Sequence, residues 1–100
     1  MINRSRYDIY AEILMVLEFY GRAGISQIGR RANIPVDRVR TMLDLLIKRG
    51  LIVEIESDNK RLGVVYLATR RGGEFLALYK KMLRYVTEIT EEEEKIWEFN

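Results

Sequence analysis

Four arginines surround a predicted helix break in the stretch IGRRANIPVDRVRTML, residues 28–43. Arg30 and Arg31 precede the Asn-Ile-Pro break, and Arg38 and Arg40 follow it. Guanidinium groups bind phosphate oxygens and guanine edges through planar pairs of N–H donors. Their concentration around one break therefore indicates a surface that meets an anion.

Catalysis is a poor first hypothesis, because the chain contains no histidine and no cysteine. Their absence removes the most common general base, the thiolate nucleophile and most transition-metal ligands. It also excludes disulfides. We expect no catalytic residue, no metal site and no cofactor.

The charge is unevenly distributed along the chain, although the net charge is only +2. Residues 1–84 hold 16 Lys and Arg against 9 Asp and Glu, which is +7, and residues 85–100 hold 1 against 6, which is −5. A basic body with an acidic end is the asymmetry expected when one surface contacts nucleic acid.

Length and composition indicate one small ordered domain. One hundred residues, 48% hydrophobic and 32% charged with a single proline, suffice for one modest core. The longest apolar run, residues 13–17, is far shorter than a membrane span, and the start MINRSRYD lacks a secretory apolar segment. We expect a cytoplasmic, nucleoid-associated protein without membrane contact.

Two helices are predicted before the break. Ser5 and Asp8 form a candidate capping box for a helix over residues 5–20, which is apolar on more than one side. After a turn at residues 21–24, Ser26 is the expected cap of a short second helix. Gly29 in that helix would permit close contact with a neighbouring helix.

The break itself is predicted to be a tight turn before a third helix at residues 36–49. Asn33 tolerates the left-handed conformation that ends a helix, and Pro35 makes Ile34 extended and has the φ suited to a helix start. The expected inner face of the third helix consists of Val39, Leu43, Leu46 and Ile47.

A hairpin and a long final helix complete the pattern. Residues 51–56 alternate apolar and acidic, and residues 63–68 form a second β-rich run, with a charged tip at 57–62. From Thr69 the helical period returns. Its apolar positions follow a heptad seam made by Phe75, Leu78, Met82, Tyr85 and Ile89.

The glutamate run at residues 91–94 allows two interpretations. In one continuous helix it would be a solvated face, with Glu91 paired to Lys95. Alternatively, Thr90 and Glu93 form a capping box that starts a new helix.

The order helix, helix, tight turn, helix, hairpin is that of a winged helix-turn-helix fold, mostly α with a small β-hairpin, plus a long C-terminal helix. In this arrangement the helix after the turn enters the major groove of double-stranded DNA, and the hairpin wing contacts the backbone or a minor groove. Arg40 and Thr41 are the best base-reading candidates. The complete predicted DNA surface is Arg30, Arg31, Asp37, Arg38, Arg40, Thr41, Lys60, Arg61, Arg70 and Arg71.

Several observations oppose this assignment. Surface arginines are commonly just solvated, and the seam residues could pack on their own domain. Asp37 could accept from cytosine or merely complement the start of its helix. Together with Asp44 it would weaken attraction to phosphate. The alternative function is a winged-helix module that binds protein in a transcription assembly.

The segments GISQIGRRANIPVDRVRTMLDLLIKRGLI and YLATRRGGEFL resemble the small archaeal winged-helix DNA-binding proteins, which include ten-kilodalton chromosomal dimers with C-terminal coiled coils. The family pattern has a short Gly-Ile strand, a Leu-x-x-Leu pair before Gly-Leu, and Tyr-x-x-Thr-x-x-Gly before the last helix. The matching residues are Gly24, Ile25, Leu43, Leu46, Gly50, Leu51, Tyr66, Thr69 and Gly72.

The resemblance implies a homodimer that binds duplex DNA as a transcription regulator or as a chromosome-organising protein. Residues 1–70 would form the DNA-binding domain and residues 71–100 the dimerisation helix with its acidic end. Gly73 and the glutamate run depart from the family pattern. The sequence indicates neither the DNA site nor a small-molecule effector.

Overall fold

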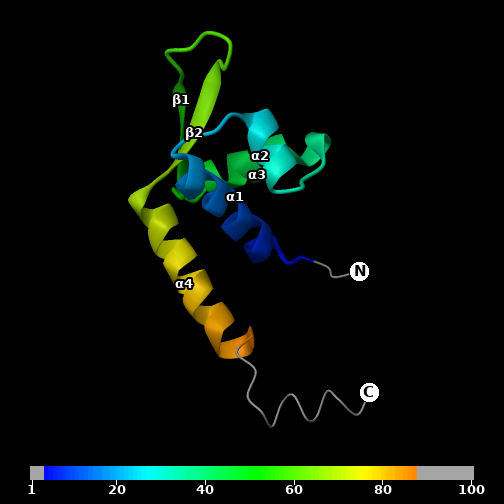
Figure 1. The fold of residues 1–100 in the computed structure, drawn as a ribbon, viewed down its shortest axis with the longest axis vertical. Helices are drawn as coiled ribbons and strands as arrows, with labels where there is room; N and C mark the ends of the chain where they lie inside the picture. Colours follow the sequence, from blue (N-terminus) through cyan, green and yellow to red (C-terminus); the bar gives the residue numbers. More distant parts are fainter. Residues whose placement is uncertain (1–3, 88–100) are drawn as a thin grey trace.

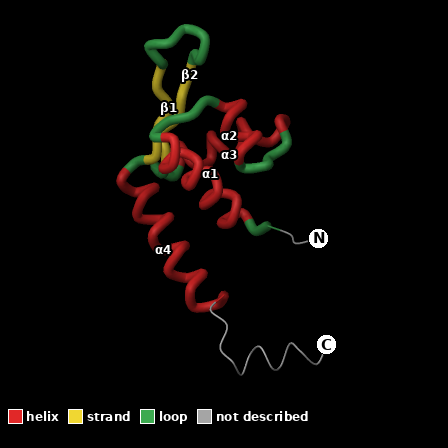
Figure 2. The backbone as a smooth tube through the Cα atoms, viewed as in Figure 1, coloured by secondary structure: helices red, strands yellow, loops and turns green. Residues whose placement is uncertain are grey.

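The computed structural model describes residues 4–87 and confirms the predicted winged helix-turn-helix order (Figures 1 and 2). The elements are α1 (Arg6–Tyr20), α2 (Ile25–Arg31), α3 (Val36–Lys48), β1 (Ile52–Glu56), β2 (Val64–Ala68) and α4 (Arg70–Thr87). The hairpin extends away from the helices at one end, and α4 extends from the base of the hairpin in the other direction (Figure 1).

The start of α1 is the predicted capping box. The Asp8 N–H donates to the Ser5 hydroxyl, and the Ser5 N–H donates to the Asp8 carboxylate at 2.8 Å. Asp8 also accepts a hydrogen bond from the Tyr79 hydroxyl of α4. One carboxylate therefore caps α1 and joins it to α4.

The predicted start of α2 was wrong by two residues. The helix begins at Ile25 with Gly24 as its N-cap, no side chain caps it, and Ser26 is an exposed helical residue. The expected strand at Gly24 and Ile25 is also absent, because Gly24 is the N-cap and Ile25 is already the first helical residue. Instead, Ala23 forms a single antiparallel bridge with Tyr66 of β2.

The helix break is the tight turn that the sequence predicts. Asn33 has a φ of 54°, and the Ile34 N–H donates to the Gly29 carbonyl at 2.9 Å. A Cβ on Gly29 would lie 2.9 Å from Cγ2 of Val39, so glycine permits the close approach of α2 and α3. The third helix ends at Lys48, with Arg49 as its C-cap, one residue before the predicted end.

The hairpin is a two-stranded antiparallel sheet in which Glu54 pairs with Tyr66 and Ile52 pairs with Ala68. The loop that closes it spans residues 57–63, close to the predicted tip. Because side chains alternate between the faces of a strand, Glu54 and Tyr66 project from the same face. This register matters for the site described below.

One hydrophobic core joins all the elements. Of the predicted inner face of α3, Val39, Leu43 and Leu46 are buried, whereas Ile47 is half-buried. The core residues are Tyr10, Ala11, Ile13, Leu14, Leu17, Ala23, Ile28, Ala32, Ile34, Val39, Leu43, Leu46, Leu51, Ile52, Tyr66 and Leu76.

The junction between α3, β1 and α4 is closely packed around Gly72. The Thr69 hydroxyl donates to the Gly50 carbonyl at 2.6 Å and accepts from the Gly72 N–H at 3.0 Å, which caps α4. A Cβ on Gly72 would lie 2.1 Å from the Leu51 carbonyl oxygen. These contacts account physically for Thr69 and Gly72 of the family pattern, and the positive φ of 75° at Gly50 favours glycine there.

Within residues 4–87, no helix is long and apolar enough to cross a bilayer. Ile89 and the glutamate run at residues 91–94 lie outside the described residues, so neither interpretation of that run is tested.

Replacing Gly72 with alanine should destabilise the fold by about 1–3 kcal/mol, because the new methyl group meets backbone rather than a movable side chain. The matched control is Gly73→Ala, where nothing lies within 4 Å of the new Cβ. Alanine there should raise stability by up to about 1 kcal/mol through helix propensity. Urea unfolding of both variants measures the difference, and equal stabilities would contradict this packing.

Candidate nucleic-acid interface

The outer face of α3 is free of contact with the core. The six residues that point away from its buried face are all exposed, and Val36 is 88% exposed. The six are Val36, Asp37, Arg38, Arg40, Thr41 and Asp44. The helix therefore presents two cations, two carboxylates, a hydroxyl and one apolar side chain.

Arg40 connects this face to the hairpin. Its Nη1 donates to the Tyr66 hydroxyl at 2.8 Å and lies 3.3 Å from Oε1 of Glu54, and the Tyr66 hydroxyl donates to the same Oε1 at 2.8 Å. We call Arg40, Glu54 and Tyr66 the helix–hairpin triad. The side chains of Arg40 and Glu54 are 57% and 41% exposed, so the triad lies at the surface, between α3 and the hairpin.

The surroundings of Tyr66 favour its neutral hydroxyl. Burial, followed by the hydrogen bond to Glu54 and the charge of that carboxylate, raises the pKa of Tyr66 to about 12, and the Arg40 charge opposes this rise. Tyr66 therefore remains a hydrogen-bond donor to Glu54 throughout the physiological range.

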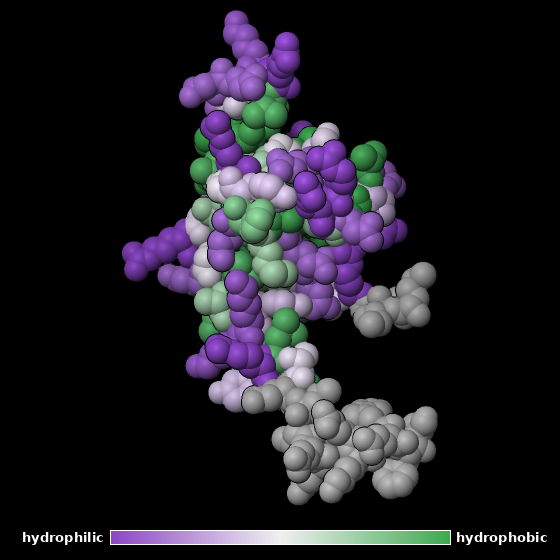
Figure 3. Space-filling view, in the orientation of Figure 1, coloured by the Kyte–Doolittle hydropathy of each residue, from purple (hydrophilic) through white to green (hydrophobic). Residues whose placement is uncertain are grey.

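Lys60 and Arg61 are exposed in the hairpin loop, where the hydrophilic surface projects furthest from the helices (Figure 3). The loop has its own hydrogen bonds. The Ser57 N–H donates to the Gly63 carbonyl at 2.7 Å, and the Arg61 N–H donates to Oδ1 of Asn59 at 3.0 Å. These bonds hold the two cations at the end of a structured turn.

The two arginines of α2 face different surroundings. Arg30 borders a surface groove between α2 and α3, together with Val36 and Val39. Arg31 lies over the ring of Tyr20, with its guanidinium carbon 5.6 Å from the ring centroid. Arg30 therefore lies beside the start of α3, whereas Arg31 contacts the end of α1.

Arg70 and Arg71 lie at the base of the hairpin, at the opposite end from Lys60 and Arg61 (Figure 1). A five-residue strand separates the two ends by about 16 Å. Arg70 is also paired with Glu74, its Nε lying 3.7 Å from Oε1. The fold does not bring these two arginines together with the cations of the hairpin tip.

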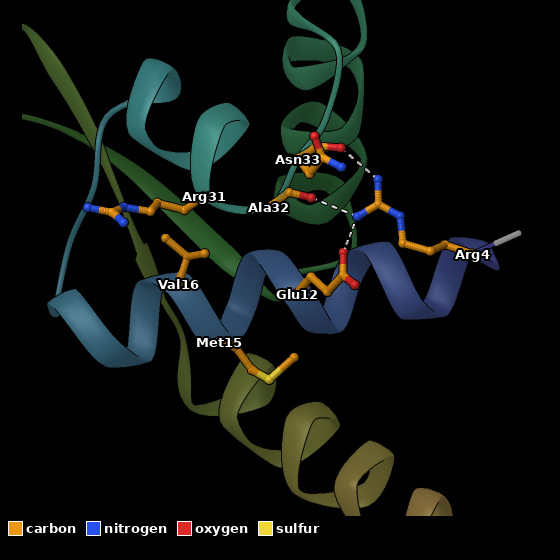
Figure 4. Close-up of a pocket in the computed structure, with 7 residues that line it drawn as sticks. All are labelled: Arg4, Glu12, Met15, Val16, Arg31, Ala32 and Asn33. Atoms are coloured by element: carbon orange, nitrogen blue, oxygen red, sulfur yellow. Dashed lines mark hydrogen bonds and ion pairs between the residues drawn. The ribbon is translucent and has the colours of Figure 1, made fainter. Parts of the chain in front are cut away.

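Arg4 holds the turn between α2 and α3 (Figure 4). Its guanidinium donates to the carbonyl oxygens of Ala32 and Asn33, at 2.7 Å each, and pairs with the carboxylate of Glu12 on α1. Carbonyls at a helix C-terminus lack partners within the helix and attract cations. Arg4 thus supplies hydrogen bonds that the broken helix lacks.

Sequence reasoning missed Arg4, Glu12, Glu54 and Tyr66 as parts of this site. The alternation of apolar and acidic residues predicted that Glu54 lies on a strand. Only the pairing register of β1 and β2 shows that it lies opposite Tyr66. The contact between Arg4 and Asn33 spans 29 residues and leaves no periodic signal. No group of three Asp or Glu side chains within residues 4–87 could hold a metal ion.

The fold and the exposed helix after the turn define a class of protein. A family model for the winged helix-turn-helix matches residues 3–87, and the chain belongs to this family. No curated protein matches the sequence.

Solved structures with the same fold include known DNA-binding proteins. Sso10a-2, a DNA-binding protein from Sulfolobus solfataricus, is 21% identical with a TM-score of 0.76, covering 96% of each chain. BpsR from Bordetella bronchiseptica, whose DNA binding is regulated by 6-hydroxynicotinic acid, is 16% identical with a TM-score of 0.69, covering 91% of this chain and 73% of its own. The oxidized form of MarR from E. coli is 14% identical with a TM-score of 0.68, covering 92% and 70%. At these identities the likeness establishes the fold alone.

Stability should fall as the pH rises from 10 to 12, because two tyrosines have raised pKa values in the folded chain. The pKa of Tyr79 is raised to about 12, first by its hydrogen bond to Asp8 and then by burial, and that of Tyr66 also rises to about 12. A raised pKa contributes stability that is complete below the unfolded value of 10 and is lost as the pH approaches 12.

Urea unfolding across this pH interval tests the expectation. Tyr66→Phe and Tyr79→Phe should each lose less stability than the parent chain, because each lacks one of the ionising groups. Tyr7→Phe is the control, since Tyr7 is 58% exposed and lies outside the seam of α4, so its variant should follow the parent. Identical pH dependence in all four proteins would contradict the hydrogen bonds described here.

Proposed function

We propose that this chain is a double-stranded DNA-binding protein that acts as a homodimer, either as a transcription regulator or as a chromosome-architectural protein. The helix α3 would enter the major groove, and the hairpin loop would contact the backbone or an adjacent minor groove. The observation that carries the proposal is the exposed outer face of α3, which presents Arg38 and Arg40, beside the exposed Lys60 and Arg61 of the hairpin tip, in a chain of the winged helix-turn-helix family.

The dimensions of the surface fit a duplex. The triad fixes the middle of α3 against Glu54, and the hairpin continues from Glu54 to Ser57 for about 10 Å before its loop begins. The major groove is about 12 Å wide. With α3 in the groove, Lys60 and Arg61 would lie near the flanking phosphates.

The individual residues have separate roles in this arrangement. Arg40 and Thr41 would contact base edges, and Asp37 and Arg38 lie on the same exposed helix. Arg30, Lys60 and Arg61 would contact phosphates. Arg31, Arg70 and Arg71 lie neither beside the start of α3 nor at the hairpin tip. They would contact only DNA phosphates outside the central site.

A protein-binding module is the second candidate, and the carboxylates favour it. Asp37 and Asp44 are exposed on α3, and Glu54 and Glu56 are exposed on β1. Four negative charges reduce the attraction of this surface for phosphate. A mixed surface of this kind also suits a protein partner of a transcription assembly.

The homodimer rests on the uncovered side of α4. Leu78, Met82 and Tyr85 are 68%, 49% and 78% exposed, whereas Phe75 packs partly on the core. A largely apolar groove of about 420 Å³ runs beside Leu78 and Met82, between α4 and the start of α1. A second copy of the seam would bury this surface. Ile89, the last seam residue, lies outside the described residues.

DNA binding should weaken steeply with salt. Each phosphate neutralised by a cation contributes about 0.9 to the slope of log K against log salt, so Arg30→Ala and Lys60→Ala should each lower the slope by about 1. Gel-shift titrations with duplex DNA at several salt concentrations measure it. Arg84→Ala, on the exposed far end of α4, removes the same charge and should leave the slope unchanged. Absence of salt-sensitive DNA binding would favour the protein module.

If two copies pair through α4, light scattering of the full chain in solution should give a molecular mass twice that of one chain. Leu78→Glu places a charge in the seam and should shift the mass toward that of one chain, because burying an unpaired carboxylate is costly. Ala77→Glu introduces the same residue at the neighbouring exposed position and should leave the dimer intact. A single-chain mass for the parent protein would refute the pairing of α4.

A further inference from the structure

We propose that Glu54 and Tyr66 are positioning residues that hold Arg40 ready to read a guanine, so the protein prefers duplex DNA with a guanine at one fixed position in each half-site. This inference rests on the proposed DNA binding and goes further, because it assigns a role to two hairpin residues and names the base. The geometry of the helix–hairpin triad carries it.

The first step concerns which donors of Arg40 are occupied. A guanidinium has five N–H bonds in one plane, of which Nη1 carries two. Nη1 lies within hydrogen-bond distance of both the Tyr66 hydroxyl and Oε1 of Glu54. Within residues 4–87 the structure shows no hydrogen bond from Nε or Nη2 of Arg40. Nε and Nη2 are adjacent in the plane and form one free two-donor edge.

The second step concerns what such an edge recognises. Guanine presents two acceptors in the major groove, N7 and O6, and paired N–H donors of one arginine match them. Adenine replaces O6 with an amino group, and the pyrimidines lack the second acceptor of this pair. A rigid two-donor edge on the helix that would enter the groove therefore selects guanine.

The third step concerns why the triad improves the selection. A free arginine side chain loses considerable rotamer freedom when it binds. Tyr66 is 1% exposed, so its ring is fixed in the core and its hydroxyl is a fixed acceptor for Arg40. Glu54 accepts from both partners, and its pairing with Arg40 offsets the repulsion that its carboxylate would exert on phosphate. The arginine is therefore ordered before DNA arrives.

A matched pair of glutamates separates this role from a general effect of charge. Glu54 and Glu56 project from the same face of β1, two residues apart, and both are exposed. Within the described chain, no hydrogen bond or ion pair joins Glu56 to Arg40. Glu54→Gln and Glu56→Gln each remove one negative charge beside the DNA surface, but only Glu54→Gln alters the triad.

The experiment begins with selection of bound fragments from randomised duplex DNA by the full chain. We expect a guanine at one position of each half-site. Affinities are then measured for that duplex and for duplexes with each other base pair at the position. The parent protein should prefer guanine by about 5- to 150-fold, and Arg40→Ala should remove the preference.

The positioning residues give the decisive comparison. Glu54→Gln and Tyr66→Phe should reduce the preference for guanine by about 3- to 10-fold, within the range of the net contribution of one typical intramolecular hydrogen bond. Glu56→Gln should retain the full preference. Glu56→Gln should bind all duplexes somewhat more tightly at low salt, because it removes a negative charge that Arg40 does not offset. A preference equally unchanged in Glu54→Gln and Glu56→Gln would overturn the positioning role.

A modified base tests the contact at the level of one atom. 7-Deazaguanine lacks the N7 acceptor, so substituting it at the selected position should weaken binding by the parent protein and have little further effect on Arg40→Ala. Equal losses in both proteins would overturn the assignment of guanine to Arg40. Salt-dependent binding with no base preference would overturn this inference and leave DNA binding standing, whereas absence of duplex binding would overturn both.

Discussion

The left-handed turn at Asn33 is the constraint on which the arrangement of this surface depends. It ends α2 and directs the chain into α3 within four residues, and it brings Gly29 against Val39 so closely that no larger residue fits without movement. The carbonyl oxygens of Ala32 and Asn33 at this break accept hydrogen bonds from the guanidinium of Arg4, which precedes α1 in the chain. A local backbone conformation is thereby supported by tertiary contacts on two sides.

The helix–hairpin triad is a second contact between distant elements, and it distinguishes Arg40 from the other arginines of the surface. From the sequence charge alone, Arg40 would be one of several solvated arginines. In the structure it is hydrogen-bonded to a buried tyrosine and paired with a strand carboxylate. The acidic residues near α3 therefore do not act uniformly. Glu54 orders a cation, whereas Glu56 is an exposed charge without that bond.

The α4 helix has two kinds of surface. Gly72 and Leu76 belong to the common core, and Tyr79 is joined to Asp8 at the start of α1. By contrast, Leu78, Met82 and Tyr85 of the same helix are largely exposed. The helix is therefore anchored to the domain on one side and presents apolar side chains on its exposed surface, which is the form expected of a helix that pairs with a second copy.

The sequence alone determined the order and type of the elements, because these follow from local chemistry. Periodicity, the Ser5 to Asp8 capping box and the tolerance of Asn33 for positive φ all act within a few residues, and each was confirmed. The exposed face of α3 followed from the same periodicity. Ser26 failed as a cap because the bridge at Ala23 is followed by Gly24 as the N-cap, so α2 starts two residues earlier.

Only the tertiary structure decided which of the arginines share a surface and which are already bonded. Arg31 meets Tyr20, Arg70 meets Glu74, and Arg40 meets Tyr66, and two of these partners lie outside the helix that carries the arginine. The contacts of Arg31 and Arg40 depend on helix packing and strand register, which bring together residues far apart in the chain. No pattern of spacing encodes these two contacts, whereas Arg70 and Glu74 are four residues apart on one helix.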